Sequence, residues 1–314
     1  MKIGILTSGG DAPGMNTCVA RLTTSLTRKK HKVFGFIGGY RGLINADFIP
    51  LNQEVVTNIG YIGGSFLKSG RCPEFKTEEG VKKGLAVLKK NKFDVLIAIG
   101  GDGTLRGVRD IIDGGANCIF IPATIDNDIM ISEKALGFDT AVNNAVSAID
   151  MIEQTMTAMD RGVVIETMGR DCSDIAVSCG LAVGASMILT PESDLNFESI
   201  AKKTLQKMKS GDTTPIIIVQ EHTLDIKALG EFLQEKTNIE FRAINLGYIQ
   251  RGGAPTVGDR ILAIKFAKCV VDSIEKGELN RCASILNDDA CVLPMKVITK
   301  NAHKSSQHLV DFVD

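Results

Sequence analysis

The sequence predicts an α/β fold with mainly parallel sheets, arranged in two domains. Three observations lead to this prediction. Short apolar runs alternate with longer segments of helical periodicity along the chain, as expected where helices cover both faces of parallel strands. Several of these runs end in glycine-rich turns that precede a helix. The 314 residues, 44% of them hydrophobic, suffice for about two domains of ordinary size.

The first half of the chain contains regular pairs of strand and helix. The run at 93–99 is unbroken and apolar, as in a central strand buried on both faces, and the run at 118–122 is closed by a proline that cannot continue a ladder. By the same reasoning we predict further strands at 2–7 and 33–37 and helices at about 15–29, 77–91, 105–113 and 139–159.

The pattern starts again after the long helix at 139–159, which indicates a second, smaller α/β layer. The strands predicted in this half are 162–167, 187–189, 215–219, 240–244, 283–286 and 290–293. The helices predicted between them are about 173–183, 197–209, 226–236 and 257–276.

Composition argues against several classes of function. A formal net charge of −1 gives no overall attraction to nucleic acid or anionic membranes. The eight cysteines are scattered without a CxxC pair, as is typical of reduced thiols in a cytosolic protein. The start of the chain does not read as a signal peptide, and the longest apolar uncharged stretch, 175–191, is shorter than the ~20 residues of a spanning helix. We therefore expect a cytoplasmic protein that binds neither nucleic acid nor membranes.

Three glycine-rich turns are candidates for phosphate binding, at 8–14, 63–73 and 100–104. In the last of them Asp102 lies between glycines, where it is expected to hold a phosphate-bound Mg²⁺, and Thr104 is expected to cap the following helix. The alternative for such turns is close packing of strand and helix.

Two further side chains near these turns are open to two interpretations. Tyr40 follows the second predicted strand and either lies against a base or covers the core. Arg71 belongs to the turn at 63–73 and is a candidate for phosphate contact, although a lone arginine is more often solvated surface.

A polar run follows the strand predicted at 118–122. It contains Thr124 and two carboxylates, Asp126 and Asp128, between apolar segments. The carboxyl edge of a parallel sheet is where ligands bind, because loops converge there beside helix N-termini. Asp126 or Asp128 is therefore a candidate base or metal ligand. The alternative is a loop in which Asp and Asn only cap and turn the backbone.

Four arginines of the second half form a second candidate anion site, since guanidinium groups match phosphate geometry. They are Arg161, Arg170, Arg242 and Arg251. Because the glycine-rich turns suit a nucleoside triphosphate, we expect two anionic substrates to meet at Asp126. The carboxylate of Asp126 should then be accessible to solvent.

Five sequence stretches occur in order over most of the chain. They are LTSGGDAPGMN at 6–16, GGDG at 100–103, TIDND at 124–128, MGR at 168–170 and IQRGG at 249–253. Together they resemble the ATP-dependent 6-phosphofructokinases of the bacterial type. The combination is far more specific than any single stretch, since a GDG turn also occurs in NAD kinases and lipid kinases.

The resemblance implies two Rossmann-like three-layer domains with the active site in the cleft between them. A larger, ATP-binding domain would comprise 1–137 and 252–300, and a smaller, fructose 6-phosphate-binding domain 138–251 and 301–314. Activity would require at least a dimer, and a tetramer is usual in the family.

The resemblance also implies catalytic roles. Asp126 would take the proton of the sugar's primary hydroxyl as that oxygen attacks the γ-phosphate, and Thr124 would hold the sugar and the transferring group. Asp102 would place Mg²⁺ on the phosphates of ATP. Arg170 would neutralise charge on the transferred phosphoryl.

The implied binding residues fall into two sets. The ATP pocket would comprise Gly10, Tyr40, Arg71, Cys72, Gly101, Asp102, Gly103 and Thr104. Fructose 6-phosphate would be bound by Thr124, Asp126, Arg161, Met168, Gly169, Arg170, Glu221, Arg242, Tyr248 and Arg251. In this set Glu221 would accept hydrogen bonds from fructose hydroxyls, and Arg161 and Arg242 would reach the site of a neighbouring subunit.

The sequence departs from the family pattern at several of these positions. Tyr248 stands where a histidine usually faces the sugar phosphate, which predicts a weaker grip on fructose 6-phosphate. Cys72 replaces an aromatic residue near the adenine, and Lys76 replaces an arginine. Gly103 is kept and Ala123 fills a position that is usually glycine, whereas pyrophosphate-using relatives carry Asp and Lys there, so ATP is favoured.

The largest departure is at the family's allosteric nucleotide site. Its basic positions are occupied by Ala20, Thr24, Gln53, Glu153, Ser210, Asp212 and Thr214. A site without these cations and with two carboxylates should bind a diphosphate poorly. We therefore predict weak or absent regulation by ADP and phosphoenolpyruvate.

Two alternative functions stay open from the sequence. One is a phosphofructokinase that uses pyrophosphate as donor. The other is a non-catalytic sugar-phosphate sensor or regulatory subunit, against which the presence of Asp102, Asp126 and Arg170 argues, because a sensor needs no base and metal carboxylate together.

Overall fold

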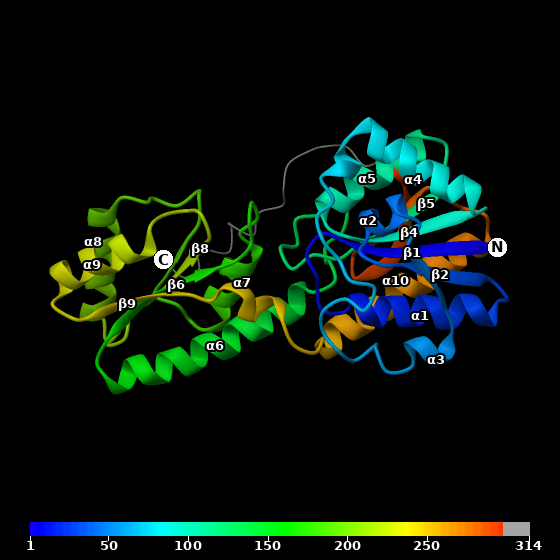
Figure 1. Cartoon of the computed structure of the whole chain (residues 1–314). Coiled ribbons are helices and arrows are strands. Elements are labelled where there is room, and N and C mark those ends of the chain that lie inside the picture. The colour runs from blue at the N-terminus through cyan, green and yellow to red at the C-terminus, as the bar shows by residue number, and fades with distance from the viewer. Residues whose placement is uncertain (298–314) are drawn as a thin grey trace. The chain divides into compact units, whose positions relative to one another are not determined.

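The computed structural model describes residues 1–297, which form two compact α/β units (Figure 1). The larger unit contains Met1–Thr140 and the described part of Gly252–Ala302, and the smaller unit contains Ala141–Arg251. The predicted class, α/β with mainly parallel sheets, is confirmed. The predicted membership of 298–300 in the larger domain and of 301–314 in the smaller one lies outside the described residues.

The larger unit is built on a seven-stranded sheet of order β11-β10-β5-β4-β1-β2-β3. Its strands are β1 (Lys2–Ser8), β2 (Lys32–Phe36), β3 (Phe48–Leu51), β4 (Val95–Gly100), β5 (Cys118–Pro122), β10 (Arg281–Leu286) and β11 (Asp289–Pro294). The central strands are parallel, whereas the edge strands β3 and β11 pair antiparallel with their neighbours. The chain passes from β1 to β2 on one side and later returns as β4 on the other, so the strand order reverses between β1 and β4.

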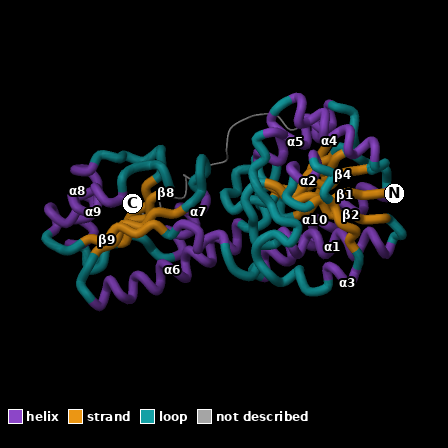
Figure 2. Tube along the Cα trace, viewed as in Figure 1, coloured by secondary structure: helices purple, strands orange, loops and turns teal. Residues whose placement is uncertain are grey.

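Helices cover both faces of this sheet (Figure 2). α1 packs against α3 and α10, and α4 packs against α2 and α5. These helices are α1 (Met15–Arg28), α2 (Tyr40–Ile44), α3 (Gln53–Val56), α4 (Glu78–Lys90), α5 (Asp102–Asp113) and α10 (Val257–Glu275), with short 3-10 turns at Glu74–Lys76 and Met295–Val297.

β4 is buried along its whole length, as its unbroken apolar run predicts. Successive side chains of a strand point to opposite faces. Leu96 and Ala98 join an apolar cluster with residues of α2, α4 and α5, and Ile97 and Ile99 are also 0% exposed. β4 therefore has core on both faces, and its carboxyl end pairs in register with that of β1.

The smaller unit has a four-stranded, wholly parallel sheet of order β7-β8-β6-β9. Its strands are β6 (Gly162–Thr167), β7 (Met187–Leu189), β8 (Ile216–Gln220) and β9 (Phe241–Asn245). Its helical segments are the part of α6 (Phe138–Ala158) from Ala141 onward, α7 (Asp174–Ala182), α8 (Phe197–Lys209), α9 (Ile226–Thr237) and the 3-10 turn η2 (Gly247–Arg251). The core beneath α8 and α9 contains Val164, Ile217 and Leu229, all 0% exposed.

Three short elements, α2, β3 and α3, were not predicted. β3 contains Pro50 and lies at an edge of the sheet, where the missing N–H of a proline is tolerated. Helices as short as α2 and α3, of five and four residues, do not show a helical hydrophobic period, and the proline in β3 argues against a strand.

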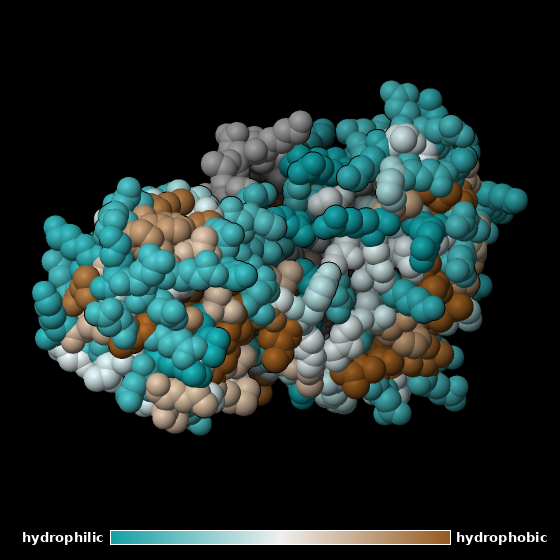
Figure 3. Space-filling model, turned by 60° about the vertical axis from the view of Figure 1, so that its left-hand side comes forward, coloured by the Kyte–Doolittle hydropathy of each residue, from teal (hydrophilic) through white to brown (hydrophobic). Residues whose placement is uncertain are grey.

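No helix among residues 1–297 has the length and apolar character needed to cross a membrane. Figure 3 shows hydrophobic residues as separate areas among hydrophilic ones on the face in view. One set of exposed apolar residues recurs at helical spacing on α10, namely Val257, Ile261 and Ile264, which are 72%, 50% and 42% exposed. We call these three residues the α10 stripe.

Candidate active site

The carboxyl ends of β1 and β4 lie side by side at the point where the strand order reverses. Ser8, the last residue of β1, pairs in register with Gly100, the last residue of β4. Crevices at such points are the usual ligand sites of open α/β sheets. The predicted glycine-rich turns at 8–14 and 100–104 therefore lie together, as their positions after two strands imply.

Different physical features explain why glycine occupies three positions at this edge of the sheet. A Cβ on Gly100 would lie 2.3 Å from Thr104 Oγ1 and 2.5 Å from the Ser8 carbonyl oxygen, so packing alone requires glycine there. Gly9 has φ +85°, which favours glycine. Gly103 is exposed, and a Cβ on it would meet nothing within 4 Å. Open space therefore lies in front of the first turn of α5.

α5 begins at Asp102 and has Gly101 as its N-cap, without a side-chain cap. The prediction that Thr104 caps this helix is wrong. Thr104 is 2% exposed, and its Oγ1 donates to the Ser8 carbonyl oxygen at 3.2 Å, which ties the helix to β1. Because no side chain caps this helix, its amino end and its positive dipole can interact with an anion.

Asp102 lies in the first turn of α5 and forms an ion pair with Arg106. The side chains of Arg106 and Asp102 are 74% and 39% exposed, and exposed ion pairs contribute little stability, so the carboxylate can exchange partners at low cost. Among residues 1–297 no cluster of three or more His, Cys, Asp or Glu side chains could hold a metal by itself. One carboxylate beside bound phosphates is nevertheless a usual arrangement for Mg²⁺.

Tyr40 is 4% exposed and belongs to the core. Its ring stacks on Phe75 with centroids 4.0 Å apart, and its hydroxyl donates to the Thr104 carbonyl oxygen at 2.7 Å. Of the two interpretations offered by the sequence, the structure favours the one in which Tyr40 covers the core. Its hydroxyl also binds the backbone of the first turn of α5.

The turn at 63–73 reaches the end of β1. The Gly9 N–H donates to the Gly70 carbonyl oxygen at 3.4 Å, and Thr7 Oγ1 donates to the Lys68 carbonyl oxygen at 2.9 Å. Arg71 is exposed directly after this contact, and Cys72 packs half-buried against the core. Arg71 is thus brought to the same edge as Gly10 and Asp102.

Thr124 and Asp126 follow β5, the neighbour of β4. The Asp126 N–H donates to Thr124 Oγ1 at 3.2 Å, and this hydroxyl lies 3.4 Å from Asp126 Oδ2. A Cβ on Gly101 would lie 3.4 Å from the Thr124 Cβ, so the two strand ends are in close contact. Asp126 is 2% exposed, and the expectation of a solvent-accessible carboxylate is therefore wrong.

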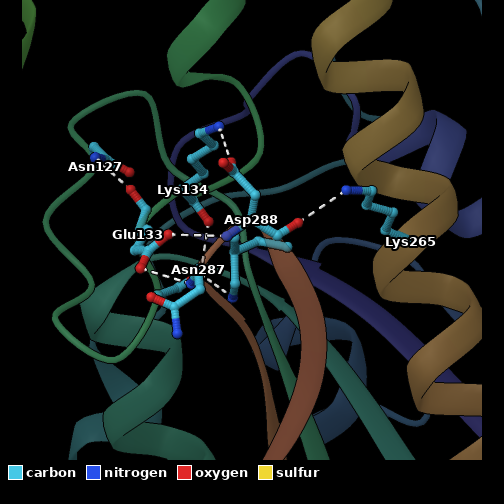
Figure 4. A network of polar contacts seen from close by, with 8 residues as sticks. Asn127, Glu133, Lys134, Lys265, Asn287 and Asp288 are labelled. Carbon is cyan, nitrogen blue, oxygen red and sulfur yellow. Dashed lines mark hydrogen bonds and ion pairs between the residues drawn. The ribbon is translucent and has the colours of Figure 1, made fainter.

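The loop after Asp126 is tied to the β10–β11 hairpin (Figure 4). The Glu133 carboxylate accepts the N–H groups of Asn287 at 2.8 Å and Asp288 at 3.3 Å, and Lys134 Nζ lies 2.7 Å from Asp288 Oδ1. Asn287 and Asp288 both have positive φ in the hairpin turn. Sequence reasoning missed this network, because its partners are separated by about 150 residues.

The side chain of Asn127 forms hydrogen bonds across the same loop. It has φ +53°, its side-chain amide donates to the Glu133 carbonyl oxygen at 3.2 Å, and its Oδ1 accepts the Ala135 N–H at 2.9 Å. The backbone next to Asp126 is therefore fixed by side-chain hydrogen bonds on both sides of the loop.

A pocket of about 220 Å³ lies at the carboxyl ends of the strands of the smaller unit. It is lined by Glu166, Thr167, Met168, Glu221, Asn245, Gly247 and Tyr248. Three of the predicted sugar-phosphate residues, Met168, Glu221 and Tyr248, therefore line one cavity. The sequence motifs did not identify Glu166 and Asn245 as pocket residues. Their positions at the ends of β6 and β9 could have indicated this, because ligands bind at the carboxyl ends of parallel strands.

Glu221 organises the turn that carries Arg170. Its Oε1 accepts the N–H of Gly169 at 3.1 Å and that of Arg170 at 2.7 Å, while Gln220 Nε2 donates to the Arg170 carbonyl oxygen at 2.8 Å. The Arg170 backbone has φ +54°, and Arg170 is exposed. Its guanidinium group is thus presented from a backbone that other residues hold in place.

Gln250 joins this turn to the segment of Tyr248 and Arg251. It is 0% exposed, its Oε1 accepts the Met168 N–H at 3.2 Å, and its Nε2 donates to the Gly247 carbonyl oxygen at 3.1 Å. The stretches at 168–170 and 249–253 are therefore brought together by a buried amide.

Arg161 and Arg242 do not join Arg170 and Arg251. They lie at the amino ends of β6 and β9, where Arg161 Nε is 2.6 Å and Arg242 Nη2 is 2.5 Å from the Glu240 carboxylate. Five strand residues separate the two ends of such a sheet by roughly 15 Å. Within one chain, therefore, the four arginines do not form one anion site, and the expectation that Arg161 and Arg242 reach the site of a neighbouring subunit stays a prediction.

Two carboxylates share the pocket of the smaller unit. Burial is the main cause that raises the pKa of Glu166 above its ordinary value, and the negative charge of Glu221 raises it further. His222 and the hydrogen bond from Asn245 act in the opposite direction. The pocket is therefore acidic and suits a ligand with hydroxyl donors.

Comparison with known proteins identifies the family of the chain. Residues 2–274 match the phosphofructokinase family. The chain belongs to this family. An ATP-dependent 6-phosphofructokinase of Alkaliphilus metalliredigens is 43% identical over 283 residues, which are 90% of this chain and 89% of that protein.

Other phosphofructokinases show the same relationship. The ATP-dependent 6-phosphofructokinase of Bacillus subtilis is 40% identical over 308 residues, covering 98% of this chain and 97% of that protein. The solved phosphofructokinase of Saccharomyces cerevisiae superposes with a TM-score of 0.86 at 26% identity, over 94% of this chain and 45% of that longer chain. The resemblance drawn from the sequence motifs is thus confirmed at the level of the family.

Proposed function

We propose that the protein transfers the γ-phosphoryl group of ATP to the primary hydroxyl of fructose 6-phosphate, giving fructose 1,6-bisphosphate and ADP in glycolysis. The observation that carries this proposal is identity of 40–43% to proteins named ATP-dependent 6-phosphofructokinase over 90% or more of the chain. A coupled assay with ATP and with pyrophosphate as donors, and several sugar phosphates as acceptors, tests it. Turnover with pyrophosphate alone would contradict it.

The choice of ATP as donor is supported by Gly103. No neighbouring atom prevents a side chain at this exposed position, so glycine there is not explained by packing within the protein. A bulky charged residue would project into the space before the first turn of α5, where the phosphates of a nucleotide would lie. The small Ala123 at the end of β5 fits the same interpretation.

In the proposed reaction the larger unit holds the donor. The glycine-lined edge with Gly10, Gly101 and Thr104 would bind the phosphates, and Arg71 would add a positive charge. Asp102 would hold Mg²⁺, which neutralises phosphate charge when bound. Asp126 would accept the proton of the attacking hydroxyl, and Thr124 would orient the two groups.

The smaller unit would hold the acceptor. Glu221 and the backbone of Met168 and Gly169 would contact the sugar, with Tyr248 and Arg251 near its phosphate. Arg170 would neutralise the charge that develops on the transferred phosphoryl group, which is where electrostatics contributes most to this chemistry. Tyr248 is 82% exposed and cannot become cationic, so a weak grip on the sugar phosphate is expected.

A homo-oligomer, usually a tetramer in this family, is part of the proposal. Arg161 and Arg242 lie at the end of their sheet opposite the pocket, so they can contribute to sugar-phosphate binding only in a neighbouring subunit's site. The α10 stripe supports oligomer formation, because apolar residues with such exposure at helical spacing are typical of contact surfaces.

Mixing two inactive variants should restore activity if sites are shared between subunits. Arg242→Ala and Asp126→Asn chains, each nearly inactive, would form hybrid oligomers in which one site has Asp126 from one chain and Arg242 from the other. We expect activity to return after dissociation and reassociation of the mixture, measured by the coupled assay. Separately reassociated variants are the control, and no gain on mixing would contradict sharing.

Regulation by ADP or phosphoenolpyruvate is expected to be weak or absent. Positions that are basic in the family's effector site carry neutral or acidic residues here, and Asp212 is engaged with Ser186 Oγ at 2.5 Å and the Thr214 N–H at 3.2 Å. Saturation curves for fructose 6-phosphate should shift less than about twofold with either ligand at millimolar concentration. A large shift by either one would contradict this prediction.

A cytoplasmic location belongs to the same proposal. All eight cysteines are free thiols in the structure, which suits a reducing compartment. A sensor without activity is the competing function, and the joint presence of Asp102, Asp126 and Arg170 argues against it. Any turnover in the coupled assay that Asp126→Asn abolishes would exclude the sensor.

A further inference from the structure

Glu166 and Asn245 line the pocket of the smaller unit without having a part in the proposed reaction. They are paired in register on the neighbouring strands β6 and β9, so both side chains leave the same face of the sheet. Asn245 Nδ2 donates a hydrogen bond to Glu166 Oε1. This bond orients the carboxylate and leaves Oε2 to accept from a ligand.

The charge of the pocket defines what it can hold. Its lining contains two carboxylates, Glu166 and Glu221, and none of its seven lining residues is cationic. A phosphate group placed among them would be repelled, whereas hydroxyl groups would find strong acceptors. The ligand portion that fits is therefore a neutral ring with several hydroxyls, with its phosphate turned outward.

The two carboxylates differ in how many oxygen atoms each can offer to a ligand. Glu221 is 19% exposed at its side chain, and its Oε1 is already engaged by the N–H groups of Gly169 and Arg170. It can offer one oxygen to a ligand. A sugar with hydroxyls on adjacent carbons can use a second charged acceptor, and Glu166 is the second carboxylate that lines the pocket.

We propose that Glu166, oriented by Asn245, is a specificity-determining residue that accepts hydrogen bonds from ring hydroxyls of the sugar phosphate. This inference rests on the proposed function and adds to it a second carboxylate beside Glu221. Glu166 would thereby select the configuration of the ring hydroxyls and the orientation of the bound sugar.

Glu166→Gln is the matched test, because a glutamine keeps the shape and can still accept the Asn245 hydrogen bond. We expect the KM for fructose 6-phosphate to rise on the order of tenfold to a hundredfold, the usual effect of losing a hydrogen bond to a charged group. The KM for ATP should stay within about twofold. Glu235→Gln, which changes an exposed glutamate of α9, is the control.

Epimers of the substrate provide a measurement that a purely structural role of Glu166 would leave unchanged. The preference in kcat/KM for fructose 6-phosphate over its C3 and C4 epimers, psicose 6-phosphate and tagatose 6-phosphate, should fall on the order of tenfold in Glu166→Gln. Asn245→Leu removes the orienting bond with a side chain of similar size and should raise the KM for fructose 6-phosphate by a smaller factor. The double variant should be less than additive, because the two residues act through one carboxylate.

Titration calorimetry with fructose 6-phosphate alone separates this proposal from the proposed reaction. A wild-type chain that binds the sugar phosphate but transfers no phosphoryl group would contradict the reaction only, and weaker binding by Glu166→Gln would still support the role of Glu166. If Glu166→Gln fails to fold, Asn245→Leu provides the same comparison. Unchanged affinity and epimer preference in the folded variants, or a wild type that does not bind fructose 6-phosphate, would overturn the proposal.

Discussion

Asp126→Asn is expected to lower kcat by a factor of about 10²–10⁴, while both substrates still bind with nearly unchanged affinity. Asparagine has the shape of aspartate and keeps an oxygen for the contact with Thr124 Oγ1, which lies 3.4 Å from Asp126 Oδ2. It cannot accept the proton of the attacking hydroxyl. The loss should therefore appear in turnover and not in binding.

The measurement combines steady-state kinetics with equilibrium binding of fructose 6-phosphate and thermal unfolding of the same preparations. Asp113→Asn is the matched control, since it removes an exposed carboxylate from the last turn of α5. It should leave kcat unchanged. Near-normal turnover in Asp126→Asn would mean that Asp126 is not the base, and a parallel loss of substrate binding would point to a structural role.

The burial of Asp126 bears on this prediction. As the proposed base, Asp126 would act in surroundings with little water, since it is 2% exposed, and charged groups act more strongly on a reacting centre there than in solution. The loop that carries it is held by Asn127 and by the bonds of Glu133 to the β10–β11 turn. These hydrogen bonds favour a base that is positioned before the substrate arrives.

Local patterns predicted most secondary structure well because the elements have strong individual signals. β5 has the predicted limits because Pro122 closes an apolar run, and α8 begins where Asn196 caps it. α5 begins earlier than predicted, at Asp102, because a glycine rather than Thr104 occupies the N-cap. A glycine N-cap makes no side-chain hydrogen bond, so the first residue of this helix is harder to predict from the sequence.

The sequence predicted many residues of the candidate site, but not how far apart they lie. Motifs placed Asp102, Thr124 and Asp126 at neighbouring strand ends, since parallel strands share a carboxyl edge. The separation of Arg161 and Arg242 from the pocket depends on which end of a strand each residue occupies. The pairing of Glu166 with Asn245 depends on the register of β6 and β9, which a single sequence does not reveal.

Arg170→Asn is expected to lower kcat by a factor of about 10²–10³, the usual effect of removing one preorganised donor from a developing negative charge. Asparagine is chosen because it tolerates the left-handed backbone, and Arg170 has φ +54°. The backbone of this turn is held by hydrogen bonds with Glu221 and Gln220. The variant should therefore keep its melting temperature, and the KM for ATP should change little.

Arg170→Lys separates charge from geometry at the same position. Lysine keeps the positive charge but lacks the planar fork that contacts two phosphoryl oxygens at once, so it should recover only part of the lost turnover. Arg28→Asn, at the exposed end of α1, is the control for losing a surface arginine and should have full activity. If Arg170→Asn kept kcat within about threefold of wild type, charge neutralisation would have to come from other groups, because catalysis of phosphoryl transfer depends on such neutralisation.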